Sequence, residues 1–322
     1  MSTPVPGGSP DAEGFVYDEM SYFAENCAEY ALEPPAELHV ERVTSSLPDG
    51  RSLSGLRWGH GEPRSVLVHG GAQNAHTWDT VALALWPVPL LAVDLPGHGH
   101  SDWRIDGDYG PRQNADDLAV MIAALAPNAE LVVGMSLGGL TVTALAARHP
   151  QLVQRLVVVD ITPGVTRDKA ADVHAFIEGP QTFGTFADIF DRTVEFNPTR
   201  SPESLRRGIL HNAHRRSDGS WQWNYDRGLA GPTDTPDAAG TREERVLADG
   251  ADLWDDVSAV GVPLTLVRGS ASPVVDDDDI AELRRRQPDA EVLVVDGAGH
   301  SIQGDRPLEL AIIISERLSS TE

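Results

Sequence analysis

Six short apolar runs rich in Val, Leu and Ile constrain the fold of this chain more than any other feature of its sequence. They lie at residues 65–70, 90–95, 129–135, 155–161, 263–269 and 291–297. Uninterrupted apolar runs of this length are typical of strands that are buried on both faces of a sheet. Segments with apolar residues near helical spacing lie between most of these runs, as connections between parallel strands require. The pattern predicts an α/β fold with a mostly parallel sheet and helices on both faces.

Two further strand-like segments precede the first run, and one long segment interrupts the pattern. ELHVERV, from residue 37, and SLSGLRW, from residue 52, indicate two leading antiparallel strands, which brings the predicted sheet to eight strands. Between Pro163 and about Asp255 the alternation gives way to aromatic-rich and polar segments, which indicates an insertion. We therefore expect four parts: an extension with a short helix at 1–37, a first core segment at 38–162, an inserted subdomain at 163–255 and a second core segment at 256–322.

The composition excludes several classes of site and partner. Cys27 is the single cysteine, which rules out an internal disulfide and any metal site built from several thiolates, and nothing in the sequence indicates a metal or a cofactor. The net charge of −24 repels phosphate backbones and anionic membranes, so we expect neither nucleic acid nor a membrane as a partner. No run approaches the roughly 18 apolar residues of a membrane span, and no secretory signal is readable, so we expect a cytoplasmic location. For the helix indicated at 17–32 we expect a packing role, either over an apolar patch or in a homodimer contact.

The residues Gly-Met-Ser-Leu-Gly at 134–138 form a G-x-S-x-G motif around Ser136. The motif follows the buried run LVV and precedes a helical segment, so the serine lies at a strand-to-helix turn. Flanking glycines suit such a turn, because a side chain there would collide with neighbouring backbone. A phosphate-binding glycine loop is the alternative, but no G-x-x-x-x-G-K-[ST] occurs, and Asp102 stands where a third glycine would follow Gly97 and Gly99. Ser136 is therefore our candidate nucleophile.

A serine hydroxyl is a weak nucleophile until a base removes its proton, so a histidine must lie beside Ser136 in the folded chain. His300 meets this need, because it follows the last predicted core strand in the loop Gly-Ala-Gly-His. Loops at the carboxyl ends of strands carry functional residues more often than buried positions do. We therefore predict His300 as the general base.

Two backbone N–H groups are needed to stabilise the oxyanion that forms when a serine attacks a carbonyl carbon. In this geometry the residue after the nucleophile supplies one of them, which is Leu137 here. The second is expected from the loop after the first buried run, where two glycines let the backbone approach closely. We choose Gly71 as this donor, with Ala72 as the alternative.

Five segments occur in the order that is seen in α/β-hydrolase-fold proteins: HGGAQNAHTW, DLPGHGHSDW, GMSLGG, VVVDITPG and GAGHS. On these motifs the chain resembles that superfamily, in its serine-nucleophile, cap-bearing esterase branch, over about residues 38–322. The resemblance implies the α/β-hydrolase fold, and it makes the insertion at 163–255 a helical cap over the active site. We accordingly expect Trp78, Met135, Trp221 and Trp223 to contact substrate, with packing inside the protein as the alternative for the three tryptophans.

The acidic partner of the histidine departs from the family pattern. The family usually places it shortly after the seventh strand, where this chain has Gly-Ser-Ala-Ser-Pro at 269–273 and no carboxylate. Some branches place it after the sixth strand, which corresponds to Asp160, and we predict Asp160 on that basis. Asp276 and Asp277 are the alternatives, although acidic residues at the start of a helix also interact favourably with the helix dipole.

The resemblance and the serine together favour hydrolysis of a small carboxylic ester, lactone or thioester through an acyl-enzyme. Carbon–carbon bond hydrolysis, or cofactor-free oxidative chemistry on the same fold, is one alternative. The carbon–carbon hydrolases typically have Asn before the serine and Trp after the histidine, where this chain has Met135 and Ser301. A non-catalytic member that binds a small molecule is the other alternative, because the fold by itself does not specify the function.

Overall fold

The computed structural model describes residues 10–11, 14–227 and 252–319. Its main sheet has eight strands in the order β1-β2-β4-β3-β5-β6-β10-β11. The first three of these neighbours pair antiparallel: β1 (Val40–Ser46), β2 (Ser52–Trp58) and β4 (Leu90–Asp94). All further neighbours pair parallel: β4 with β3 (Ser65–Val68), then β5 (Leu131–Met135), β6 (Leu156–Val159), β10 (Leu264–Gly269) and β11 (Glu291–Val295). The prediction of an α/β fold built on an eight-stranded, mostly parallel sheet is confirmed.

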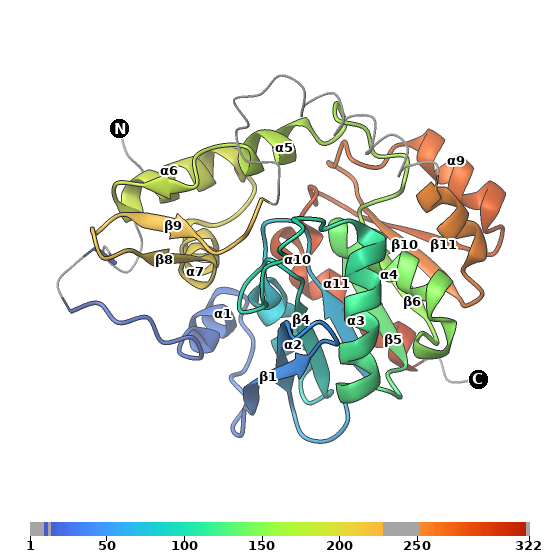
Figure 1. Ribbon diagram of the computed structural model, residues 1–322, viewed down its shortest axis with the longest axis horizontal. Coiled ribbons are helices and arrows are strands. Elements are labelled where there is room, and N and C mark those ends of the chain that lie inside the picture. Colours follow the sequence, from blue (N-terminus) through green and yellow to red (C-terminus); the bar gives the residue numbers. More distant parts are fainter. Residues whose placement is uncertain (1–9, 12–13, 228–251, 320–322) are drawn as a thin grey trace.

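Helices cover both faces of this sheet (Figure 1). One apolar cluster joins the sheet to α3 (Pro111–Leu125), α4 (Leu137–Arg148) and α9 (Asp277–Arg286). A second cluster joins the other face to α1 (Phe23–Glu29), α2 (Asp79–Leu85) and α11 (Pro307–Ser319). Successive residues of a strand point to opposite faces, so in β3 Val66 and Val68 belong to the first cluster and Leu67 to the second. Burial on both faces explains why the central strands are continuous apolar runs. The edge strand β11 is partly exposed instead, with Val294 59% exposed, so the prediction of a buried strand is wrong there.

The helix near the N-terminus packs on the chain's own core. Phe23 and Cys27 of α1 are buried in the second cluster, and the Phe23 ring lies 4.8 Å from the Trp58 ring. Of the two packing roles expected for this segment, α1 therefore takes the covering of an apolar patch. A homodimer contact through it stays a prediction.

The strand order creates the edge at which the site forms. β3 lies between β4 and β5, so the chain leaves β3 toward one neighbour and later returns to its other side. In open α/β sheets, ligands bind outside the carboxyl ends of the strands at such a switch point. Two short helices stand near this edge: the 3₁₀ helix η1 (Ala75–Trp78), which follows the β3 loop, and α10 (Ile302–Asp305), which follows the β11 loop.

The segment between β6 and β10 forms a separate layer beside the core (Figure 1). Its described elements are α5 (Ala171–Ile177), β7 (Thr182–Phe183), α6 (Phe186–Phe196), α7 (Pro202–Asn212), β8 (Ala213–Arg215) and β9 (Trp221–Trp223). The sequence predicted a helical insertion, but the structure adds an antiparallel sheet in the order β7-β9-β8. Strands of two or three residues are too short to show a periodic pattern, which is why this sheet was missed.

The predicted division into four parts stays a prediction. Residues 228–251 of the segment predicted as an insertion lie outside the described residues, as do residues 1–9, 12 and 13 of the extension. In the described part of the chain, no helix has both the length and the apolar character that crossing a membrane requires.

Candidate active site

Ser136 occupies a strained turn between β5 and α4. Its backbone has φ 52° and ψ −122°, a conformation that residues with a side chain rarely adopt. Gly134 makes the turn possible, because a Cβ atom at this position would lie 2.3 Å from the carbonyl oxygen of Gly138. The tight turn leaves Ser136 half-buried while its neighbours in β5 are fully buried. Strain of this kind is typical of the nucleophile elbow that exposes a reactive serine above a sheet.

His300 lies between this serine and a buried carboxylate. Its Nε2 atom is 3.1 Å from Ser136 Oγ, and its Nδ1 atom is 2.9 Å from Asp160 Oδ2. Because a carboxylate can only accept, Nδ1 carries the hydrogen and Nε2 directs its lone pair at the serine hydroxyl. The structure thus brings together the three residues that the sequence predicted as a catalytic set.

Asp160 is fully buried at the end of β6 and has a positive φ of 52°. Its Oδ1 atom accepts a hydrogen bond of 2.9 Å from the N–H of Gly269, and its Oδ2 atom accepts one from the hydroxyl of Ser272. The sequence analysis missed Ser272 as a member of the site. Ser272 lies in the loop after β10, the seventh strand in the sheet order, where the family usually carries its acid. In this chain the loop instead supplies hydrogen-bond donors to an acid at the end of the neighbouring strand, β6. These donors stabilise the carboxylate, since a buried charge is tolerated only when it is hydrogen-bonded.

The alternative acids point elsewhere. Asp276 caps the N-terminus of α9, where it accepts from the N–H of Asp279, and it forms an ion pair of 2.8 Å with Lys169. These contacts hold the pKa of Asp276 below its ordinary value. The Asp277 side chain is 95% exposed and pairs with Arg268. Asp276 and Asp277 are therefore part of an acidic cluster at the start of α9. The geometry favours Asp160 as the acidic partner of His300.

The loop after β3 passes directly beside the nucleophile. A Cβ atom on Gly70 would lie 3.0 Å from Ser136 Cβ and 2.6 Å from Met135 Sδ, so a larger residue there would have to displace one or both side chains. The N–H of Ala72, the alternative oxyanion donor, is occupied by a hydrogen bond of 3.0 Å to His98 Nε2. This leaves Gly71 as the better candidate of the two, together with Leu137 at the first position of α4.

Two buried neutral histidines brace this loop. His69 accepts the N–H of Leu95 at Nε2 and donates from Nδ1 to the carbonyl of Gly70, while His98 accepts the N–H of Ala72 and donates to Pro96. Each bond pattern requires an uncharged ring. Burial lowers the pKa of His69 to about 4, and burial with the neighbouring His69 lowers the pKa of His98 to about 3. Both rings therefore stay neutral near pH 7 and fix the backbone that carries Gly71.

Three of the four predicted substrate contacts are core residues instead. Trp78 is fully buried within the second apolar cluster, and Met135 is buried in the same cluster. Trp221 packs edge-on against Phe186, and its indole N–H donates to Asp11 at 2.6 Å. Large aromatic rings fill cores as readily as pockets, and sequence position alone does not separate the two roles. Trp223 is buried in the same apolar cluster as Trp221, but it also lines a cavity.

This cavity, of about 130 Å³, lies beside the oxyanion loop. The cavity is lined by residues from α1, from the β3 loop with η1, from α7 and from α10. Phe176 and Trp223 add apolar surface. Most lining side chains are polar: Asn26, Gln73, Asn74, His76, Thr77, Asp79, Thr80, Thr193, Asn197, Arg200, Ser204, Arg207, His211, Asn212 and Gln303. Polar side chains and apolar surface both contribute to the lining, and the cavity meets the oxyanion loop at Ala72 and Gln73.

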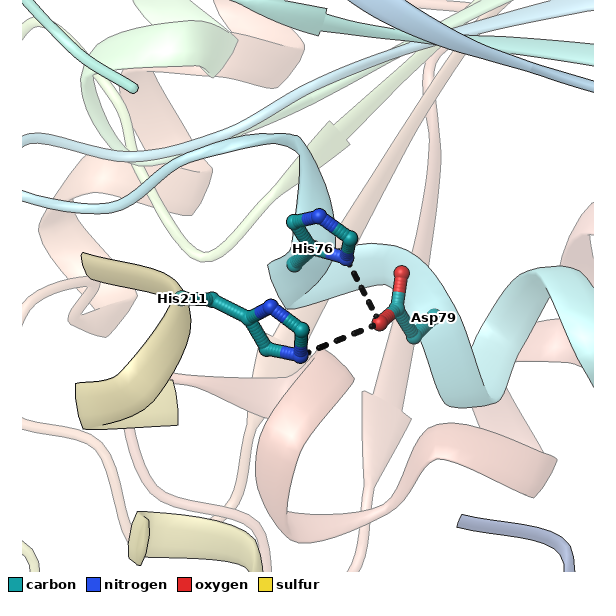
Figure 2. Close-up of side chains that lie close together, drawn as sticks. All are labelled: His76, Asp79 and His211. Carbon is teal, nitrogen blue, oxygen red and sulfur yellow. Dashed lines mark hydrogen bonds and ion pairs between the residues drawn. The ribbon is translucent and has the colours of Figure 1, made fainter. Parts of the chain in front are cut away.

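A second histidine–carboxylate cluster forms part of the cavity wall (Figure 2). His76 Nδ1 lies 2.9 Å from Asp79 Oδ2, and His211 Nε2 lies 3.8 Å from the same oxygen. The two imidazole rings stack face to face, with centroids 3.8 Å apart and planes 9° apart. Lone pairs in two parallel planes cannot both point at one ion, so in this arrangement the cluster does not form a metal site.

Glu19 completes this cluster on the opposite side of His76. Its carboxylate lies 3.0 Å from His76 Nε2 and also pairs with Arg42. Burial disfavours the charge on His76, but Asp79 and Glu19 together outweigh it and raise the pKa of His76 to about 9. Burial also disfavours the charge on Glu19, and its bonds to His76 and Arg42 outweigh that effect and lower its pKa to about 2. His76 is therefore an imidazolium held between two carboxylates.

The chain is similar in sequence and in structure to known proteins. The sequence model of the α/β hydrolase fold family matches residues 66–307. The esterase Rv0045c of Mycobacterium tuberculosis is 44% identical over 305 residues, which are 92% of this chain and 94% of that protein. Its crystal structure superposes with a TM-score of 0.77 over 94% of this chain and 99% of that one. The 2-(acetamidomethylene)succinate hydrolase of Mesorhizobium japonicum is 27% identical over 86% of this chain and 95% of its own length.

Proposed function

The chain belongs to the α/β hydrolase fold family, and we propose that it is a serine hydrolase that cleaves a carboxylic ester, lactone or thioester through an acyl-enzyme intermediate. The observation that supports this proposal most directly is the chain of hydrogen bonds from Ser136 Oγ through His300 to Asp160, at 3.1 and 2.9 Å. The similarity to a protein named an esterase, over nine-tenths of both chains, supports the same chemistry.

In the first half of the proposed reaction, His300 Nε2 takes the proton of Ser136 as Oγ attacks the carbonyl carbon of the ester. The negative charge that forms on the carbonyl oxygen is stabilised by the backbone N–H groups of Leu137 and Gly71. Asp160 stabilises the imidazolium and holds its Nδ1–H in place. His300 then donates the proton from Nε2 to the departing alkoxide, which leaves as the alcohol and forms the acyl-Ser136 ester.

In the second half, a water molecule replaces the alcohol. His300 Nε2 accepts a proton from this water, and the oxygen attacks the acyl carbon. The same two N–H groups stabilise the second oxyanion. Return of the proton to Ser136 Oγ breaks the acyl bond and releases the carboxylic acid. Neither half requires a metal or a cofactor.

We further propose that residues 163–255 act as a cap over this site. Trp223 of β9 and Asn212 of α7 line the cavity beside the oxyanion loop, and the Asn212 amide donates to the carbonyl of Ala72 at 2.7 Å. This direct bond connects the insertion to the loop that carries Gly71. A cytoplasmic location, a small-molecule substrate and the absence of a nucleic-acid partner complete the proposal, and the charge of −24 supports the last of these.

Labelling with a fluorophosphonate tests the proposal. Intact-mass measurement of the wild-type protein should show the addition of one phosphonyl group, and peptide mapping should locate it on Ser136. The Ser136→Ala variant should remain unlabelled. Ser270→Ala, which removes an exposed hydroxyl from the loop after β10, should be labelled like the wild type. A folded wild-type protein that stays unlabelled, or a label on another residue, would contradict the proposal.

A further inference from the structure

Three residues around the site share a rare backbone conformation. A positive φ is uncommon in residues with a side chain, and among the described residues it occurs at Ala31, Ala72, Ser136 and Asp160. Such strain persists only where the surrounding structure holds it, and it concentrates at functional sites. Ser136 and Asp160 belong to the proposed catalytic set. Ala72, which has a φ of 57° and directly follows the oxyanion donor Gly71, has no role in that mechanism.

Two peptide units connect Ala72 to the N–H of Gly71. The carbonyl of Ala72 and the N–H of Gln73 belong to one unit, and this N–H donates to the carbonyl of Gly70 at 3.3 Å. The carbonyl of Gly70 and the N–H of Gly71 form the other unit. Because a trans peptide is planar, its C=O and its N–H point in opposite directions. The bond that holds the Gly70 carbonyl therefore also fixes the direction of the Gly71 N–H.

The Gly71 N–H itself is left for a ligand. Within the described part of the chain it donates no hydrogen bond. A Cβ atom on Gly71 would lie 4.0 Å from Cδ2 of Leu137, so the two proposed oxyanion donors belong to residues that are neighbours in space. The contribution of this N–H to the oxyanion hole depends on the direction in which it points.

The carbonyl of Ala72 accepts a hydrogen bond from the insertion. Asn212 Nδ2 donates to it at 2.7 Å, and both residues are buried. The amide of Asn212 is oriented by Asn74, whose Nδ2 group donates to Asn212 Oδ1 at 3.4 Å. On its other side Ala72 donates its N–H to His98 at 3.0 Å. The strained residue is thus held from the core by His98 and from the insertion by Asn212.

The helix that ends at Asn212, α7, is itself fastened to the rest of the protein. Asn74 Nδ2 also donates to the carbonyl of His211 at 2.9 Å. Four residues earlier in α7, Arg207 Nε donates at 3.0 Å to Asn26 Oδ1 of α1, the helix that packs on the core. The amide of Asn212 therefore has a defined place beside the β3 loop.

We propose that Asn212 is a positioning residue for the oxyanion hole, because its bond to the Ala72 carbonyl keeps the N–H of Gly71 directed at the oxyanion. The inference rests on the proposed function, since it concerns the same reaction. Without this bond, Ala72 can relax to a negative φ, which rotates the following peptide unit away from the carbonyl of Gly70. His69 still donates to that carbonyl at 2.7 Å, so the hole is weakened rather than lost.

Steady-state kinetics with 4-nitrophenyl butyrate test this role. Asn212→Ala removes the donor, and Asn212→Leu removes it while keeping the number of side-chain atoms. Each should lower kcat by about 10- to 30-fold, which is less than the loss of about 100- to 1,000-fold that follows deletion of an oxyanion donor. KM should change by less than about threefold, because the oxyanion is absent from the bound ester. Thermal melts check folding, and Asn212→Leu carries the test if Asn212→Ala does not fold.

Asn114→Ala is the matched control. Asn114 lies in α3, is fully buried and donates through Nδ2 to another backbone carbonyl, that of Tyr109, at 3.0 Å. Its loss should lower the melting temperature in a similar way and leave kcat within about twofold. The control therefore separates a general loss of stability from a loss of positioning.

Butylboronic acid measures the oxyanion hole without turnover. Ser136 Oγ adds to the boron atom while His300 takes the serine proton, and the tetrahedral anion places a boron-bound oxygen at the oxyanion position. In the Asn212 variants the dissociation constant of this complex should rise by the factor by which kcat/KM falls. A smaller fraction of folded protein would lower the apparent kcat and leave this dissociation constant unchanged.

Parallel losses in kcat/KM and in affinity for the boronic acid, with the Asn114 control unaffected, support the inference. Full kcat in the Asn212 variants, a higher KM with unchanged kcat, unchanged affinity for the boronic acid, or an equal loss of kcat in the control overturns it while leaving the hydrolase proposal intact. If the wild-type protein neither cleaves the ester nor takes up fluorophosphonate, the proposed function itself has failed.

Discussion

His300 and His76 each lie 2.9 Å from a carboxylate through Nδ1, but the two imidazoles differ at their other nitrogen. Nε2 of His300 faces the hydroxyl of Ser136 at 3.1 Å, whereas Nε2 of His76 faces the carboxylate of Glu19 at 3.0 Å. Asp79 and the second carboxylate, Glu19, together hold the proton on His76 and raise its pKa to about 9 against the opposing effect of burial. Such a ring cannot accept a proton from a substrate near pH 7.

The comparison shows that a neighbouring carboxylate alone does not make a histidine a general base. Asp160 and Asp79 are both buried, and each holds the Nδ1–H of its histidine. What differs is the group on Nε2 and the element that carries the ring. His300 stands on the loop after β11 beside the elbow, while His76 stands on η1 and is almost enclosed. We therefore expect the first pair to affect catalysis and the second to affect stability.

The largest expected effect is on kcat, and it distinguishes the Asp160–His300 pair from the Glu19–His76 pair. Asp160→Asn should lower kcat by about 10⁴, because the imidazolium loses its counter-charge and the ring its tautomer. Glu19→Gln removes a carboxylate at a similar distance from the other histidine, and it should change kcat by less than about tenfold. Steady-state kinetics of both variants on one activated ester, with folding checked by circular dichroism, makes the comparison. Similar losses of kcat in the two variants would contradict the proposed difference between the two histidine–carboxylate pairs.

The Glu19–His76 pair, which we expect to matter little for catalysis, should contribute to the stability of the fold. Glu19→Gln should lower the free energy of unfolding by about 1–3 kcal/mol at pH 6, because charged hydrogen bonds from His76 and Arg42 are replaced by weaker ones. Urea unfolding followed by fluorescence measures this difference. Arg57 and Glu41 form a more exposed pair between β1 and β2, so Glu41→Gln is the control and should lower the free energy of unfolding less than Glu19→Gln does. A larger loss in the control than in Glu19→Gln would contradict the account.

A smaller effect is expected from the second donor to Asp160. Ser272→Ala removes the hydroxyl that donates to Asp160 Oδ2, while the Gly269 N–H remains on Oδ1. We expect kcat to fall by about tenfold, which corresponds to about 1.4 kcal/mol. Ser272→Thr, which keeps a hydroxyl, should recover part of the loss. Full activity in the alanine variant would mean that Ser272 does not help to position the acid.

The smallest expected effect is the pH dependence of the Glu19 contribution. The pKa of His76 is raised to about 9 in the folded protein, above its ordinary value of 6.5. Its charge therefore contributes stability that is fully present below pH 6.5 and is lost as the pH rises through about 9. The difference in unfolding free energy between wild type and Glu19→Gln should shrink over this range by about 1 kcal/mol. It should not vanish, because Arg42 stays charged. A difference that grows with pH would reverse the assigned sign.

The sequence predicted the sheet because each buried parallel strand is an uninterrupted apolar run that local composition reveals. It predicted Ser136 and His300 as a pair for a related reason, since both follow such runs directly. Asp160 ends the run before the insertion, and the fold brings it to His300 across 140 residues of chain. The sequence analysis chose Asp160 from the family pattern, and the geometry was needed to set aside Asp276 and Asp277.

Other features have no local signature. Trp78 and Trp223 are equally aromatic, and only the packing shows that the first fills the core and the second lines the cavity. The Glu19–His76 pair joins residues 57 positions apart, and although His76 lies in the HGGAQNAHTW segment, nothing in that segment indicates Glu19 as its partner. Asn212 and Ala72 come from different parts of the chain and become neighbours only through the packing of α7 beside the β3 loop. Such tertiary contacts depend on how layers pack, which a pattern along one chain does not encode.

The central claim is that Ser136 carries the acyl group during turnover. Acid quenching of the reaction with 4-nitrophenyl butyrate, in the first moments after mixing, should trap a butyryl ester. Mass spectrometry of the digested protein should find that added mass on the peptide that contains Ser136, and Asp160→Asn should form the same species more slowly. Turnover at the normal rate in Ser136→Ala, or a butyryl group trapped on a different residue, would contradict the account.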